Sequence, residues 1–136
     1  KKSFSLQLIT LADYLITGED KKLSIIGMFD KFFVKELPSV HKQMWLIMVF
    51  TGDIDQKEKV HMSVRNPLGE EELSTDIDIA IGENRKATVT INFEGFPVRE
   101  IGTFTISITK GKKDLGVYTF ESFLLKNSDS KNKITN

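Results

Sequence analysis

The sequence contains no cysteine among its 136 residues. This absence excludes disulfide-stapled folds, thiol catalysis and the usual cysteine-ligated zinc sites. Net charge is absent too: 19 basic and 19 acidic side chains cancel, so the chain lacks the positive excess of a general nucleic-acid binder. The longest apolar run, Met44 to Phe50, is far shorter than the roughly 20 residues that cross a membrane. We therefore expect neither nucleic acid nor a membrane as a partner.

A chain of this length corresponds to about one domain, large enough to bury a core without disulfides or metals. The amino-terminal residues lack an apolar block followed by a small-residue cleavage site, which favours a cytoplasmic protein. We expect a single domain over residues 3–126. The polar residues 127–136 are expected to form a disordered tail.

Alternation of apolar and polar residues is the clearest positive signal. Residues 73–81, 87–93 and 103–109 place an apolar residue at every second position, with Thr75 as the one exception, and mostly threonine, serine or aspartate between them. This period is typical of half-buried antiparallel strands. About eight such segments, separated by turn-forming residues, predict an all-β fold, an antiparallel β-sandwich of immunoglobulin-like kind.

Two hairpins are expected from the turn residues. They are Leu6–Thr17 with Leu23–Val34 around Gly18–Lys21, and Thr103–Lys110 with Leu115–Leu125 around Gly111–Asp114. In the last of these strands the apolar residues change parity. This change predicts a β-bulge near Ser122.

The first third of the chain does not follow the one-sided pattern. Residues 1–50 are 52% apolar, whereas residues 51–136 are 33% apolar. The segments 4–16, 23–34 and 44–50 are apolar on both faces, so both faces need cover. Either the domain covers them itself or one face meets another chain. For the second case we expect three aromatic residues to anchor the interface: Phe32, Phe33 and Trp45.

Three segments carry a resemblance to a known family: Leu23–Asp30, Ala12–Tyr14 before it and Pro38–His41 after it. With the opening hairpin and the segment Phe96 to Ile108, these residues resemble a bacterial family known only as a domain of unknown function. The resemblance covers residues 6–125. It implies a small single-domain β-sandwich and a bacterial or phage source, and it implies no activity and no functional residue.

Acidic residues suggest two alternative functional sites, a catalytic carboxylate pair and a calcium site. Asp13 and Asp30 interrupt apolar strands, but at roughly 10 Å apart along a hairpin they are at or beyond the wide end of the spacing in inverting glycosidases. The stretch Glu70–Asp78 carries five acids and no base, which is compatible with calcium but lacks a glycine-punctuated ligand loop. Structural hydrogen bonds and a solvated acidic face are the preferred readings.

The remaining candidates for chemistry are weak. His41 and His61, with methionines, offer soft ligands for copper, but His61 and Met62 point to opposite sides of a strand. The Gly-x-Ser-x-Gly, Walker and dinucleotide motifs are absent. We therefore expect no enzyme activity, no metal and no cofactor.

The sequence as a whole predicts a non-catalytic protein-interaction module or assembly subunit of bacterial or phage origin. Its partner would be another protein or a second copy of the chain. The alternative is a β-sandwich that binds a small molecule, a carbohydrate or calcium.

Overall fold

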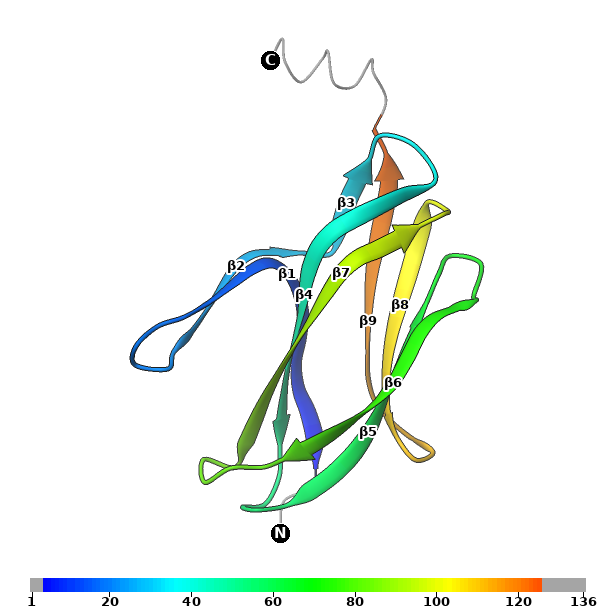
Figure 1. Ribbon diagram of the computed structural model, residues 1–136. Coiled ribbons are helices and arrows are strands. Elements are labelled where there is room, and N and C mark those ends of the chain that lie inside the picture. Colours follow the sequence, from blue (N-terminus) through cyan, green and yellow to red (C-terminus); the bar gives the residue numbers. More distant parts are fainter. Residues whose placement is uncertain (1–3, 126–136) are drawn as a thin grey trace.

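The computed structural model describes residues 4–125, which form nine strands (Figure 1). In chain order the strands are β1 (Ser5–Thr17), β2 (Leu23–Phe29), β3 (Lys31–Val34), β4 (Ser39–Thr51), β5 (Lys57–Arg65), β6 (Glu71–Ala80), β7 (Lys86–Val98), β8 (Gly102–Lys110) and β9 (Lys113–Leu124). No helix long and apolar enough to cross a membrane occurs within this part of the chain. The expected tail at 127–136 lies outside the described residues.

The strands form two sheets that pack face to face. Sheet A has the order β2-β1-β4-β7, and sheet B has the order β3-β9-β8-β5-β6. The pairings are antiparallel except that β3 runs parallel to β9. With β1, β4 and β7 as strands A, B and E, and β5, β8 and β9 as C, F and G, this is the immunoglobulin arrangement. The predicted immunoglobulin-like sandwich is therefore confirmed.

The core lies between the sheets and is rich in phenylalanine. Phe104 and Phe120 stack with ring centroids 5.0 Å apart, and Phe96 meets Phe104 edge-on at 5.4 Å. All three side chains are buried, and such rings contribute about 1.5–3 kcal/mol each through loss of apolar contact with water. The apolar positions of the alternating segments in the second half of the sequence contribute side chains to this core.

The first hairpin differs from its prediction at one point. The turn at Gly18–Lys21 forms as expected, but the strand expected over 23–34 breaks at Asp30. After Asp30 the chain crosses to sheet B, where β3 pairs with β9 and the Asp30 carbonyl accepts the Glu121 N–H at 2.8 Å. The crossing explains the apolar residues on both parities, because β2 and β3 present opposite parities to the core.

The expected bulge near Ser122 is wrong. The register between β8 and β9 is continuous from Phe104 to Gly102, which pairs with Ser122, and its shift lies at Ile108–Thr109 instead. Ser122 occupies a core-facing position because its hydroxyl accepts the Gly102 N–H at 3.2 Å and donates to the Glu100 carbonyl at 3.4 Å. The change of parity that predicted the bulge has another cause: Phe123 points outward, where its ring lies 5.5 Å from that of Phe33.

The β1–β2 hairpin extends beyond the sandwich. β1 pairs with β4 only as far as Ala12, which faces Trp45, whereas it pairs with β2 up to Thr17. Figure 1 shows the blue hairpin projecting away from the two sheets, and residues 13–27 are here called the arm. The arm and the sheet that carries it hold most of the exposed apolar side chains of the first third.

Candidate functional site

The three predicted interface aromatics lie in different environments. Phe32 belongs to the core, where its ring lies 6.2 Å from that of Phe120. Phe33 points outward, is 50% exposed and contacts the ring of Phe123 at 5.5 Å. Trp45 is half-buried on the outer side of sheet A. The structure therefore leaves Phe33 and Trp45 at the surface and places Phe32 inside.

The outer side of sheet A carries exposed apolar side chains on neighbouring strands. Register places Met28, Ala12 and Trp45 in one row across β2, β1 and β4, with Tyr14 and Ile26 in the next row. Four of its side chains are widely exposed: Leu8 at 40%, Tyr14 at 60%, Ile26 at 45% and Met28 at 63%. We call this surface, Leu8, Tyr14, Ile26, Met28 and Trp45, the outer apolar face.

Buried residues lie beneath the outer apolar face although they do not belong to the core. Ala12 and Ile47 are 0% and 1% exposed, yet neither is part of the cluster between the sheets. Asn92 pairs with Trp45 on this side, and its Oδ1 is buried without a hydrogen-bond partner among the described residues. Side chains of the same sheet therefore already cover the middle of this face, and the exposed apolar side chains lie around it.

A groove opens where β1 leaves β4. It has a volume of about 640 Å³ and is lined by the arm, by β3 and by the first residues of β4. We call it the split groove and define it by the side chains that its chemistry depends on: Asp13, Tyr14, Phe33, Lys35, Val40 and Lys42.

His41 also lines the split groove, at the boundary with the core. Its ring lies 4.5 Å from Phe32 and 5.9 Å from Phe29. Burial lowers the pKa of His41 below its ordinary value, and the Asp13 carboxylate opposes this shift with a smaller effect. The imidazole is therefore held neutral at neutral pH, so that the positive charge of the groove comes from its lysines.

Gly27 leaves room for the Asp13 side chain in the arm. Gly27 faces Asp13 across the hairpin with a φ of +74°, and a Cβ built on it would lie 2.5 Å from Asp13 Oδ2. Asp30 lines a different cavity, with Thr10 and Tyr118 among its neighbours. The two carboxylates weighed as a catalytic pair thus do not share a site.

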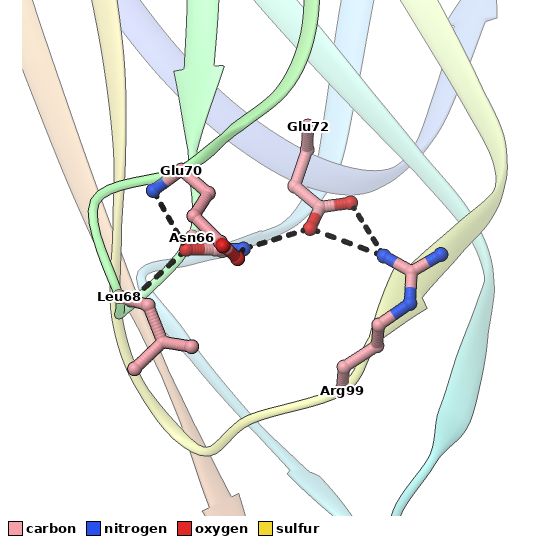
Figure 2. A network of polar contacts seen from close by, with 5 residues as sticks. All are labelled: Asn66, Leu68, Glu70, Glu72 and Arg99. Carbon is pink, nitrogen blue, oxygen red and sulfur yellow. Dashed lines mark hydrogen bonds and ion pairs between the residues drawn. The ribbon is translucent and has the colours of Figure 1, made fainter.

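The acidic stretch is engaged in hydrogen bonds and ion pairs within the domain (Figure 2). Asn66 Oδ1 accepts the N–H groups of Leu68 and Glu70 at 2.9 and 3.0 Å, and its Nδ2 donates to Glu70 and Glu72. Arg99 completes the network by an ion pair with Glu72 at 3.0 Å. Within residues 4–125, no cluster of three or more His, Asp or Glu side chains is arranged to hold a metal ion.

The two histidines are also separated. His41 is on β4 of sheet A, whereas His61 is on β5 of sheet B and its Nδ1 lies 2.8 Å from Asp76 Oδ1. Met44 and Met62 are buried in the core. The structure therefore brings no pair of histidines together with methionine.

Sequence reasoning missed Leu8, Tyr14, Ile26 and Met28 as surface residues. Beyond the register shift between Leu6 and Leu8, even-numbered positions of β1 and those of β2 share the outer side with odd-numbered positions of β4. The sequence does contain a signal for them, because both even- and odd-numbered positions of β1 and β2 carry apolar residues. Only the pairing of β1 with β4 shows which of the two sets faces the core.

The strand order of the two sheets defines the class as an immunoglobulin-like β-sandwich. A family model, the family of unknown function DUF6941, matches residues 7–121. The chain belongs to this family, which confirms the resemblance to an uncharacterised domain. The comparison with curated protein sequences finds no match.

Solved structures show the same fold at low sequence identity. A β-glucosidase from Listeria innocua, in complex with glucose, is 14% identical with a TM-score of 0.53, and the match covers 90% of this chain and 16% of that one. The alkylpurine DNA glycosylase AlkC from Pseudomonas fluorescens, bound to DNA containing an abasic site analog, is 9% identical with a TM-score of 0.51; the coverages are 90% and 31%. An immunoglobulin-like protein from Pseudomonas aeruginosa is 10% identical with a TM-score of 0.49, and the coverages are 89% and 97%.

These likenesses concern the fold alone. The chain spans about a sixth of the length of the β-glucosidase and about a third of the glycosylase. Immunoglobulin-like sandwiches carry many unrelated functions, so neither sugar hydrolysis nor DNA repair follows for this chain.

Proposed function

We propose that this protein is a non-catalytic assembly subunit that docks its outer apolar face against the same face of a second copy. The observation that carries the proposal is the exposure of Tyr14 and Met28 beside Trp45 on one side of sheet A. An antiparallel sheet with one wet face normally presents polar side chains there. Apolar side chains on this side gain stability when a second surface removes them from water.

The size of the surface supports docking. At their exposed fractions, Leu8, Tyr14, Ile26 and Met28, together with Ile16 in the arm, expose about 500 Å² in total, comparable with the largest apolar patch of a typical monomer. Each partner in a standard interface buries about 800 Å². The threonines of β7 that border the patch supply part of the remaining area.

Charge supports a second copy as the occupant. Among the paired residues of sheet A, the charged side chains at outward positions of β7 are Lys86, its first residue, and Glu94, four residues before its end. The apolar side chains between them carry no charge, so two copies meet there without like-charge repulsion. An arrangement that reverses the strand direction brings Lys86 of each copy towards Glu94 of the other.

The test compares two substitutions at equally exposed apolar residues. Met28→Glu places a charge in the outer apolar face, and Leu68→Glu places one in the β5–β6 turn, where Leu68 is 64% exposed. Light scattering after size exclusion should give twice the chain mass for the wild type and for Leu68→Glu, and the single-chain mass for Met28→Glu. Circular dichroism checks that both variants fold.

A wild type that stays monomeric at high micromolar concentration would contradict self-association. So would a dimer that Met28→Glu leaves intact. The cytoplasmic location and the bacterial or phage origin stay predictions from the sequence.

A further inference from the structure

The split groove contains an open strand edge. β4 pairs with β7 along its whole length, from Ser39 to Thr51, but its pairing with β1 ends at Trp45. Ser39–Met44 therefore has a strand on one side only, among the residues that the structure describes. In an antiparallel pair, alternate residues direct N–H and C=O to either side, so about three residues of this segment present both groups to the groove.

The groove has room for a strand at this edge. Its volume of about 640 Å³ lies between the arm, which does not pair with β4, and the residues of β4 that precede Trp45. Hydrogen-bonded strands lie about 4.8 Å apart, and an added strand next to β4 would occupy the position that β1 leaves after Ala12. An open strand edge with free space beside it is what an extended peptide needs in order to bind as an added strand.

Side chains around the edge define what the added strand should carry. Lys35 and Lys42 line the groove and outnumber its single carboxylate, Asp13, while burial keeps the pKa of His41 low. Tyr14 is 60% exposed and lies on the side of sheet A that Trp45 faces, where it provides an apolar wall. Lys42, at an even-numbered position of β4, points to the opposite side. The groove thus complements a segment that alternates acidic and apolar residues, because side chains of a strand point to opposite faces.

We propose that the split groove binds an extended segment of a partner protein, with alternating acidic and apolar residues, as an added strand beside Ser39–Met44 of β4. The acidic residues lie against Lys35 and Lys42, and the apolar residues pack on Tyr14. Tyr14 belongs to both the split groove and the outer apolar face, whereas the open edge of β4 and the two lysines belong to the groove alone. The proposal therefore does not rest on the proposed self-association.

The test uses end-blocked peptides of alternating valine and glutamate, with fluorescence anisotropy on the full chain. Two further peptides carry N-methyl groups, one on every valine and the other on every glutamate. Only one set of amides faces β4 in an added strand. We expect the unmodified peptide to bind, one methylated peptide to lose binding at least tenfold, and the other to bind as the unmodified one does.

Charge reversal provides a second test of the proposal. Lys35→Glu together with Lys42→Glu should weaken the valine–glutamate peptide about tenfold and create affinity for a valine–lysine peptide. Lys112→Glu, in the exposed β8–β9 turn, is the matched control and should change neither. Met28→Glu should also bind the peptide normally, which separates this proposal from the dimer.

Failure of the valine–glutamate peptide to bind would overturn the proposal. Equal binding by all three peptides would overturn it as well, because simple charge attraction does not depend on backbone N–H groups. Loss of binding with both methylated peptides would contradict the one-sided pairing of an added strand.

Discussion

Replacement of Asn66 by alanine is expected to be among the most destabilising single changes at the surface of sheet B. The side chain accepts the N–H groups of Leu68 and Glu70 and donates to the carboxylates of Glu70 and Glu72, all at 2.9–3.1 Å. The Glu72 side chain is only 9% exposed, so it depends on protein donors rather than water. Asn66→Ala leaves Arg99 as the remaining side-chain partner of this carboxylate.

The magnitude follows from the groups left without partners. Each turn N–H contributes about 1 kcal/mol when bonded, and a charged buried acceptor loses somewhat more. Together these give about 3 kcal/mol, which corresponds to a fall of roughly 10 °C in Tm for a domain of this size. Urea unfolding followed by far-ultraviolet circular dichroism measures the change.

Asn84→Ala is the matched control for this prediction. Asn84 is exposed in the β6–β7 turn and accepts a single N–H, from Lys86, at 3.3 Å. Its loss should cost no more than about 0.5 kcal/mol. If the two variants lose equal stability, the Asn66 network does not organise the turn, and the structural reading of Glu70 and Glu72 is refuted.

Three further outcomes are expected. Calcium should leave the Tm of the wild type unchanged, because the carboxylates of Glu70 and Glu72 are already engaged; a rise of several degrees would contradict this. Gly116→Ala should destabilise the chain, since the new Cβ would lie 2.7 Å from Leu6 Cδ2, and a Leu6→Ala background should reduce the cost; equal costs in both backgrounds, measured by urea unfolding, would count against this contact. Burial lowers the pKa of His41 in the folded chain, so the unfolded chain binds more protons and the stability falls as the pH drops through about 6.5. His41→Gln should flatten that part of the curve of stability against pH, and an unchanged slope would refute its assignment to His41.

The sandwich was predictable because its second half alternates cleanly. Ile106 and Ile108 face the core at every second position of β8, so one-sided burial fixes both strand and face. The crossing at Asp30 was not predictable in this way. Leu23–Val34 contains apolar residues on both parities, and only the pairing of β3 with β9 shows that two sheets share them.

The candidate surfaces were predictable only as a region. The excess of apolar residues in the first third indicated an unusual surface, and Trp45 does lie on it. Tyr14 and Met28 were not identified, because exposure depends on where β1 leaves β4. The open edge at Ser39–Met44 has no signature in residue type at all, since it consists of backbone groups that a neighbouring strand does not reach.

The absence of cysteine permits a direct measurement of the docking geometry. A single nitroxide label at Thr90→Cys reports from the outer side of sheet A, and one at Thr119→Cys reports from the outer side of sheet B. If the outer apolar faces meet, pulsed dipolar spectroscopy should give a shorter distance between copies for Thr90→Cys than for Thr119→Cys, by about 20 Å, since each copy adds one sheet spacing. No dipolar coupling at Thr90→Cys, or the reverse order of the two distances, would contradict the account.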